Sequence, residues 1–357
     1  MVCGPSRDAV SGVSTHVNQI FGSSLAKTYC LVHFQVGSEG RPESTPQKIV
    51  RIVASPLTLL KEIVRFRPDV IHLNTSLVRN AYWRDLAYLL VARILHCKVV
   101  YQVHGGDLPS DFLGHNTLGR GFLRWSLAIP DVIVLLAESE REAYRSFATA
   151  KPLIVIPNAI DLAEYRAARP KSFEGSGIVL GYIGRLAAEK GVGEAIRAVA
   201  ILQRSGFDGL RFRIAGSGPY ERELRESVDR EGLQEVVEFV GPVFGEAKAR
   251  FWESIDLFVF PTAREGLPYT ILEAMASATP VLTTRVGCIP DTIQEGVQGA
   301  FLSSRDPESI AGRLRAIVTD RERLRSMSSE ALRCARDHYS VERLAAQFDE
   351  LYRGLLA

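Results

Sequence analysis

The amino-acid sequence predicts an α/β protein built from two doubly wound parallel-sheet domains. Short apolar runs alternate with segments of helical periodicity from one end of the chain to the other, which is typical of parallel strands joined by crossover helices. The length of 357 residues corresponds to about two domains. Hydrophobic residues make up 46% of the chain and charged residues 24%, which is the usual composition of a globular protein.

The first half contains five apolar runs of strand length, separated by segments in which apolar residues recur at helical spacing. A further short strand is expected at Met1–Gly4. The other predicted strands are Tyr29–Val36, Val70–Leu73, Val99–Val103, Val132–Leu136 and Leu153–Ile156. The predicted helices include Val13–Leu25, Pro56–Phe66, Ala81–Leu95 and Glu138–Phe147.

The second half repeats this alternation. Its predicted strands are Ile178–Ile183, Phe212–Ala215, Val236–Val240, Leu257–Phe260 and Val281–Thr283. Its predicted helices include Glu194–Gln203, Glu221–Glu231, Glu246–Glu253 and Ile271–Ser277. A polar stretch from Asn158 to Ser176 that contains several Pro and Gly residues predicts the boundary between the two domains. We therefore expect a first domain at 1–160, a second at 161–340, and a C-terminal helix at 341–357 that packs back on the first.

Composition excludes several classes of protein. No apolar run reaches the roughly 18 residues of a membrane helix, and charged residues near the start argue against a signal peptide. The five cysteines are scattered without a CxxC pair, which argues against a disulfide framework or zinc site and favours a reducing, cytoplasmic location. Residues 1–157 carry a charge of +5 and the remainder −3, too little for a dedicated nucleic-acid binder.

Ligands of doubly wound sheets bind beyond the carboxyl ends of the strands, and polar motifs follow several predicted strands. Gly184 and Arg185 come directly after the strand Ile178–Ile183, and Lys190 precedes a helix. Arginine supplies a bidentate fork and lysine a point charge, so the two can converge on one anion. This pattern indicates a diphosphate site; the alternative is a basic turn that touches only solvent.

Two further turns follow strands of the second half. Gly216 and Gly218 suit a tight turn beneath a ligand, although a plain turn explains them equally well. Glu265, in the segment Glu265-Gly266-Leu267-Pro268, lies eight positions before Glu273. Apolar residues flank Glu273, which is an unfavourable setting for an unpaired charge and favours a function for this carboxylate. Backbone N–H groups near Gly266 and Leu267 are candidates for binding a phosphate or a sugar hydroxyl.

The first half offers two weaker candidates. His104 follows the strand Val99–Val103 and precedes two glycines, so it can serve a polar ligand or be a satisfied structural histidine. Gly12 opens a helix after the first strand, where close approach of a ligand and a tight turn are equal alternatives. His72 and Asn74 share one face of a buried-looking strand and are expected to be mainly structural.

Together, these segments resemble the group 1 glycosyltransferases of family 4, over essentially the whole chain. The resemblance rests on Gly184-Arg185 with Lys190-Gly191, on Gly216-Ser217-Gly218-Pro219, and on Glu265-Gly266-Leu267-Pro268 through Glu273. It implies the GT-B architecture, two Rossmann-like domains that face a cleft. It also implies transfer of a sugar from a nucleotide-sugar donor with retention of the anomeric configuration.

The resemblance implies a role for each residue. Arg185 and Lys190 would neutralise the donor diphosphate, Glu273 would hold the ribose hydroxyls, and Glu265 would contact the transferred sugar. His104 would lie near that sugar and Gly12 near the diphosphate. The departing phosphate would help to deprotonate the acceptor, so no protein nucleophile, metal or other cofactor is expected. The family has two adjacent glycines where this chain has Ser11-Gly12, and this departure weakens the case for Gly12 and His16 as site residues.

The expected partners are a nucleotide-sugar donor, with UDP- and GDP-sugars favoured, and a glycan or lipid-linked acceptor of a surface-polysaccharide pathway. Aromatic and basic residues at Ala81–Lys98 and at Arg120, Arg124 and Trp125 fit peripheral contact with an anionic membrane at its inner face, and equally a buried helix with a solvated rim. Two rival functions remain: a nucleotide-sugar epimerase of the same architecture, and a non-catalytic partner subunit.

Overall fold

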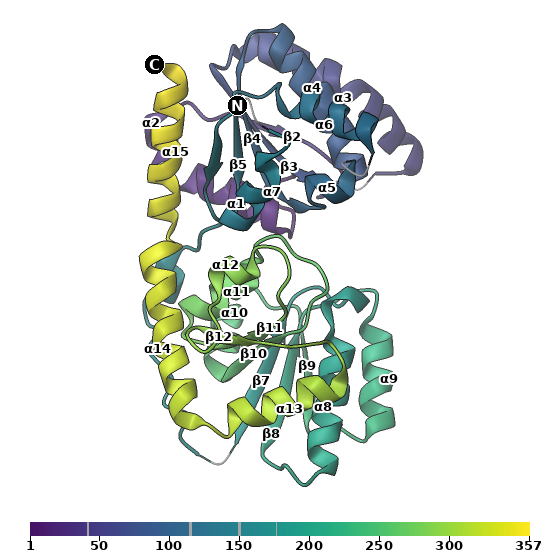
Figure 1. The fold of residues 1–357 in the computed structure, drawn as a ribbon, viewed down its shortest axis with the longest axis vertical. Coiled ribbons are helices and arrows are strands. Elements are labelled where there is room, and N and C mark those ends of the chain that lie inside the picture. Colours follow the sequence, from purple (N-terminus) through teal and green to yellow (C-terminus); the bar gives the residue numbers. More distant parts are fainter. Residues whose placement is uncertain (41–42, 114–115, 149–150, 176) are drawn as a thin grey trace. The chain divides into compact units, whose positions relative to one another are not determined.

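The computed structural model describes residues 1–40, 43–113, 116–148, 151–175 and 177–357. Ser176, the end of the expected linker, lies outside the described residues. Contacts divide the chain into two units, Met1–Ala159 together with Val341–Ala357, and Ile160–Ser340. Each unit contains a six-stranded parallel sheet with helices packed against it, which confirms the predicted class of two doubly wound domains (Figure 1).

The sheet of the first unit has the strand order β2-β1-β3-β4-β5-β6. Its strands are β1 (Val2–Gly4), β2 (His33–Gln35), β3 (Val70–Leu77), β4 (Lys98–Gly106), β5 (Val132–Leu135) and β6 (Leu153–Val155). Its central strands are buried because helices cover both faces, so their residues form nearly continuous apolar runs. The chain adds β2 on one side of β1 and β3 on the other, which places the switch point of this sheet between β1 and β3.

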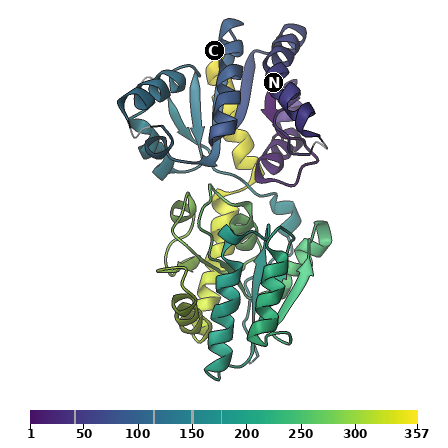
Figure 2. The ribbon, with the colours of Figure 1, turned by 90° about the vertical axis from the view of Figure 1, so that its right-hand side faces the viewer.

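Different helices cover the two faces of this sheet. Buried side chains of α3 (Thr45–Phe66), α4 (Arg79–Ile94), α6 (Thr117–Leu127) and α7 (Glu138–Arg145) pack in one apolar cluster. Those of α1 (Gly12–Gly22), α2 (Leu25–Thr28) and α15 (Val341–Leu356) pack in another. A short helix, α5 (Pro109–Phe112), follows β4. Figures 1 and 2 both show α15, in yellow, beside this sheet, where Leu344, Phe348 and Leu351 are buried.

The second unit has the strand order β12-β11-β10-β7-β8-β9. Its strands are β7 (Ile178–Ile183), β8 (Leu210–Ala215), β9 (Val237–Gly241), β10 (Leu257–Phe260), β11 (Val281–Thr283) and β12 (Gly299–Phe301). Its helices are α8 (Val192–Arg204), α9 (Glu221–Glu231), α10 (Gly245–Ser254), α11 (Tyr269–Ala276), α12 (Ile289–Thr292), α13 (Pro307–Val318) and α14 (Arg321–His338), with 3-10 turns at Leu162–Tyr165 and Ala188–Lys190. The switch point lies between β7 and β10.

Two of the expected elements begin more than three residues from the predicted position. Helix α3 begins at Thr45 rather than Pro56, because Ser44 and Gln47 form a capping box and Pro56 is accommodated inside the helix. The expected strand Tyr29–Val36 is reduced to His33–Gln35, since the preceding residues form α2 and a short connection. There the Tyr29 hydroxyl donates to Asp349 Oδ1 of α15 at 2.8 Å. The apolar run therefore reflected packing against a helix rather than strand pairing.

Over the residues described above, none of the helices combines the length and the hydrophobicity that a bilayer crossing requires.

Candidate functional site

Most of the candidate residues gather at the carboxyl edge of the sheet in the second unit. Gly184, Arg185 and Lys190 follow β7, Gly216 and Gly218 follow β8, and Glu265 through Glu273 follow β10. Because β10, β7 and β8 are neighbours in one parallel sheet, the loops after them leave the same edge. These loops flank the switch point between β7 and β10, where a ligand site is expected in an open α/β sheet.

The turns after β7 and β8 are packed directly against each other. A Cβ atom on Gly216 would lie 1.9 Å from the carbonyl oxygen of Gly184, and one on Gly218 would lie 2.2 Å from that of Leu186. Gly216 also has a φ of +134°, a conformation that residues with side chains rarely adopt. The two glycines are therefore required by close backbone packing, and Gly184 and Gly216 remain partly exposed.

Lys190 and Glu265 form an ion pair between the loops after β7 and β10. The Lys190 Nζ donates to Glu265 Oε1, and the Thr262 hydroxyl donates to the same carboxylate oxygen at 3.1 Å. The backbone N–H of Ala263 donates to the carbonyl of Glu189 at 2.8 Å, which joins the two loops beside the pair. The side chains of Lys190 and Glu265 keep 21% and 12% of their surface exposed, so a ligand can reach them.

Unlike Lys190, Arg185 has a side chain that forms no ion pair with the residues that the structure describes. The Tyr182 hydroxyl donates to the Arg185 backbone carbonyl at 2.8 Å and fixes the turn. Within the described parts of the chain, no hydrogen-bond or ion-pair partner holds the Arg185 guanidinium, and the residue is exposed. An arginine whose donors are free at the edge of a sheet is suited to bind a phosphate group.

Glu273 lies on α11 and is buried, with 8% of its surface exposed. Lys248 of α10 donates to its Oε1 at 2.7 Å. Burial raises the pKa of Glu273, and the positive charge of Lys248 opposes that rise without cancelling it. The apolar neighbours of Glu273 in the sequence indicated that this carboxylate needs a partner. Nothing in the sequence pointed to Lys248, because the two residues lie on different helices and share no motif.

The segment between Glu265 and Glu273 is held by the loop after β11. The backbone N–H of Cys288 donates to the Gly266 carbonyl at 3.0 Å, and the Thr284 hydroxyl donates to the Thr262 carbonyl at 2.6 Å. Leu267 is buried and anchors the loop, and Pro268 is the N-cap residue of α11. The loop is thus fixed by its surroundings before any ligand is present, and Thr262 and Thr284 are supporting residues that the sequence did not single out.

His104 and Gly12 belong to the first unit. The strand β4 continues through Gly106, so His104 lies within the strand rather than after it as expected. His104 Nε2 is 2.8 Å from Asn74 Oδ1, and its ring is 4.6 Å from that of His16. Gly12 is the first residue of α1, whose N-cap is Ser11. The ten other candidates therefore lie in the second unit, and these two do not.

His72 and Asn74 are buried and hydrogen-bonded, as expected of structural residues. His72 Nδ1 is 2.6 Å from the Tyr352 hydroxyl, and its Nε2 is 2.8 Å from Gln102 Oε1. Asn74 Nδ2 donates to the Cys3 carbonyl at 3.0 Å. Among all residues that the structure describes, no group of three or more His, Cys, Asp and Glu side chains is arranged to hold a metal ion.

Two family models match the chain in tandem. The one described as "Glycosyl transferases group 1" matches residues 166–333, and the one described as "Glycosyltransferase Family 4" matches residues 24–164. The chain resembles the D-inositol 3-phosphate glycosyltransferase of Corynebacterium urealyticum, with 29% identity over 63% of this chain and 57% of that protein. It also resembles the putative colanic acid biosynthesis glycosyltransferase WcaL of Escherichia coli, with 27% identity over 70% of this chain and 62% of WcaL.

A third relative is the GDP-mannose-dependent alpha-(1-6)-phosphatidylinositol monomannoside mannosyltransferase of Mycobacterium tuberculosis, 25% identical over 72% of this chain and 70% of that protein. The matches thus span about 57–70% of these relatives' lengths. Among solved structures, Anabaena HepE in complex with UDP aligns with a TM-score of 0.73 and 17% identity over 99% of both chains. Sucrose-phosphate synthase of Thermosynechococcus elongatus aligns with a TM-score of 0.77 and 18% identity over 99% and 98%. These likenesses confirm the expected GT-B fold.

Proposed function

This chain belongs to the group 1 glycosyltransferases of family 4, and on that premise we propose that it transfers a sugar from a nucleotide-sugar donor to a hydroxyl group of a glycan or lipid-linked acceptor. The observation that carries the proposal is the Lys190–Glu265 ion pair between loops that flank the switch point of the second sheet, together with the exposed Arg185 guanidinium on one of these loops. Two cations and a carboxylate there suit a diphosphate joined to a sugar. HepE binds UDP and the mycobacterial relative is named for GDP-mannose, which supports a UDP- or GDP-sugar.

Each side chain has a defined task in this proposal. Arg185 and Lys190 neutralise the diphosphate, where negative charge grows as the nucleotide departs. The Glu265 carboxylate, assisted by the backbone near Gly266, Leu267 and Pro268, contacts the transferred sugar. Glu273 accepts hydrogen bonds from the ribose hydroxyls. Gly184, Gly216 and Gly218 leave the backbone open to the donor.

The proposed reaction retains the anomeric configuration and needs no metal. The bond from the anomeric carbon to the diphosphate oxygen breaks, and the acceptor oxygen bonds to that carbon on the same face. The acceptor proton passes to the departing phosphate oxygen, so no protein nucleophile takes part. Arg185 and Lys190 stabilise the charge that a divalent cation would otherwise stabilise. His104 is assigned a contact to the sugar and Gly12 a contact to the diphosphate.

We further propose two points: that the protein acts in surface polysaccharide synthesis, and that it makes peripheral contact with the inner face of the membrane. The name of the WcaL relative supports the first point. For the second, the burial of Tyr82 and Tyr88 fits the alternative of a buried helix with a solvated rim at 81–98, so these two residues do not carry the proposed contact. Trp83 and Trp125 each keep 50% of their surface exposed and remain available for such contact.

The experiment that tests the proposed function is a calorimetric panel of UDP, GDP, ADP and their common sugar conjugates, with and without added divalent metal. One nucleotide should bind tightly without metal, and binding should be lost in Lys190→Ala and Glu273→Ala. Arg222→Ala is the matched control, because the Arg222 side chain is 81% exposed on α9. No binding by the folded protein would favour the non-catalytic subunit. Conversion of the donor to an isomer without any acceptor would favour the epimerase.

A further inference from the structure

Helix α3 presents an apolar stripe to solvent. Its inner side is formed by Ser55, Leu59 and Ile63, which are buried. Its outer side exposes large apolar side chains at positions that recur every three or four residues, and Val53 and Leu57 keep 73% and 69% of their surface exposed. The stripe consists of Ile49, Val50, Val53, Leu57, Leu60 and Val64. At 1.5 Å per residue it runs for about 22 Å along the helix.

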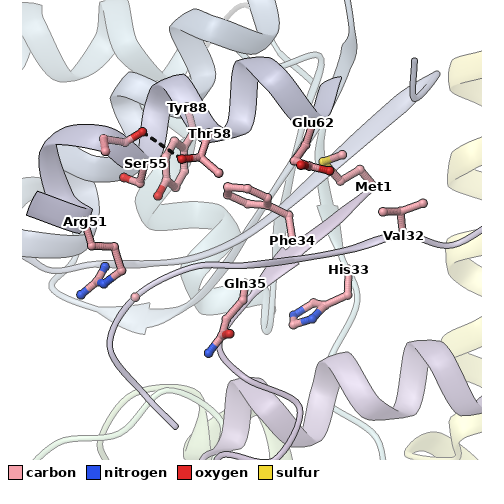
Figure 3. A pocket seen from close by; sticks show the side chains of 12 residues that line it. Met1, Val32, His33, Phe34, Gln35, Arg51, Ser55, Thr58, Glu62 and Tyr88 are labelled. Atoms are coloured by element: carbon pink, nitrogen blue, oxygen red, sulfur yellow. Dashed lines mark hydrogen bonds between the residues drawn. The ribbon is translucent and has the colours of Figure 1, made fainter. Parts of the chain in front are cut away.

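The side of α3 that faces its own domain lines a pocket. Ser55, Thr58 and Glu62 face a pocket of about 310 Å3 that Phe34 and Gln35 of β2 also line, as Figure 3 shows. This side of α3 is therefore turned toward its own domain, with Leu59 and Ile63 in the core and polar side chains at the pocket. The apolar side is turned away from it, and no described part of the domain covers the stripe, since its residues remain exposed.

The neighbouring helices extend the apolar surface. Helix α4 packs beside α3, and α6 packs beside α4 through Trp83 and Phe122, whose rings are 5.5 Å apart (Figure 1). The Phe122 ring is in turn 5.4 Å from that of Trp125. Further exposed apolar residues on α4 and α6 are Leu90, Ile94 and Leu118. We call the outer surfaces of these three helices the α3–α4–α6 face. So many exposed large apolar side chains on three helices of one sheet face are unusual on a protein that meets only water.

The same face carries a strong positive charge. Helices α3, α4 and α6 contain nine Lys and Arg and only two acidic residues, a net charge of +7, whereas the whole chain has +2. Of the two acids, Asp85 is buried and paired with Arg84, which makes that pair neutral. The other eight cations of the three helices are opposed by Glu62 within them and by Glu43, which pairs with Arg51 just before α3 begins. The helices on the opposite face of the sheet, α1, α2 and α15, contain three basic and three acidic residues. The positive charge is therefore confined to the side that also exposes the apolar stripe.

We propose that the α3–α4–α6 face docks on an anionic lipid surface, with the stripe of α3 inserted at the interface and the surrounding cations on the lipid phosphates. An apolar helix face flanked by Lys and Arg, with exposed Trp beside it, is the combination that binds such surfaces. A second copy of the chain is a poorer occupant, because pairing would bring two faces of +7 together. Docking would bring the protein close to a lipid-linked acceptor, and this consequence rests on the proposed function. Binding to the lipid surface itself does not require that the protein transfers a sugar.

The test is sedimentation of the full chain with vesicles of phosphatidylcholine alone and of phosphatidylcholine mixed with phosphatidylglycerol, at low and at high salt. We expect binding to the mixed vesicles, weakened by salt because the cations act through screened attraction. The double variant V53E/L57E should bind at least about tenfold more weakly, and K48E/K61E should lose a similar factor, since each Lys near such a surface contributes appreciably. The controls are F244E, at an exposed apolar residue of the second unit, and K27E on α2.

Three results would overturn the proposal: absence of binding to the anionic vesicles, equal binding by V53E/L57E and by the controls, or a concentration-dependent dimer in ultracentrifugation that V53E/L57E abolishes. Circular dichroism and the nucleotide panel serve as checks on the variants. Both pairs of substituted side chains are exposed, so fold and nucleotide binding should be retained. Vesicle binding without nucleotide binding would contradict the proposed function alone, and nucleotide binding without vesicle binding would contradict the docking alone.

Discussion

Lys190 and Glu265 are 75 positions apart in the chain, yet their side chains are joined by an ion pair across the switch point of the second sheet. The cation assigned to the diphosphate is held by the carboxylate assigned to the sugar. Both charges are thereby kept in place in a partly buried setting where an unpaired charge would be costly. The arriving diphosphate would share Lys190 with Glu265, so the pair preorganises the site rather than blocking it.

The first prediction concerns this pair. Lys190→Ala should lower kcat/KM for transfer by about two orders of magnitude or more, because one preorganised cation at the developing charge is removed. Glu265→Gln keeps the size of the side chain and a hydrogen-bond acceptor for Thr262, and should lower kcat more than it weakens nucleotide binding. Steady-state kinetics together with calorimetry of the nucleoside diphosphate measures both effects. Full activity in a folded Lys190→Ala variant would remove Lys190 from the proposed site.

The second prediction concerns the buried pair of Glu273 and Lys248. Burial raises the pKa of Glu273, so the folded protein holds this proton more tightly than the unfolded chain does. Stability contributed by the protonated carboxyl is present below the unfolded pKa and is lost as pH rises through the folded pKa. Lys248→Met removes the charge that opposes the rise, so the pKa of Glu273 should increase further. The variant should therefore be less stable than the wild type by about 2 kcal/mol near neutral pH.

The measurement is thermal unfolding of wild type and Lys248→Met at one acidic pH, about 5, and at one pH, about 8, where an ordinary carboxyl group is fully ionised. The difference in stability between the two proteins should be larger at the higher pH. Arg250→Met is the control, since Arg250 lies on the same helix with 68% of its side chain exposed. A difference that does not change with pH would contradict the assignment of the shift to Glu273.

The sequence predicted the second unit well because its motifs lie at strand ends, where chemistry and topology coincide. The strands β7, β10 and β11 have the expected bounds, and the polar residues after β7 and β10 do meet. Lys248 was missed because its partner lies on another helix. The sequence left open whether Tyr82 and Tyr88 lie on the surface or in the core, because residue type does not show which side of α4 faces the core; the structure buries both. The outer stripe of α3 escaped notice for a related reason, since Pro56 suggested a helix start inside a helix that begins at Thr45.

The third prediction concerns three histidines of the first unit, of which His16 and His72 are buried and His104 is partly buried. Burial lowers the pKa of His16 to about 4 and that of His72 to about 3, and it lowers the pKa of His104 well below its usual range. The unfolded chain binds these protons near pH 6.5, so stability is present above that pH and is lost as pH falls toward the folded values. Each histidine should contribute a loss of up to about 1.4 kcal/mol per pH unit within that window.

Hydrogen exchange of β3 and β4 at about pH 7 and about pH 5.5 measures this loss within the first unit, independently of the second. His16 is the informative position, because both of its ring nitrogens are buried without a hydrogen-bond partner among the described residues. His16→Leu should make the acid-induced loss of protection smaller. His338→Leu, at an exposed histidine, should leave the loss unchanged. An equal loss in wild type and His16→Leu would show that His16 does not take up a proton on unfolding.

The fourth prediction concerns the packed turns after β7 and β8. Gly216→Ala places a methyl group where the carbonyl oxygen of Gly184 now lies and forces a φ of +134° on a residue with a side chain. The turn must move, so unfolding free energy should fall by about 2 kcal/mol or more and nucleotide binding should weaken with it. Gly312→Ala is the matched control, because Gly312 lies inside α13 with no atom within 4 Å of the added Cβ. That variant should be more stable by about 0.5–1 kcal/mol, since alanine is the better helix former. Denaturant unfolding and calorimetry on both variants test the contrast, and equal nucleotide binding by Gly216→Ala and Gly312→Ala would place the donor away from this turn.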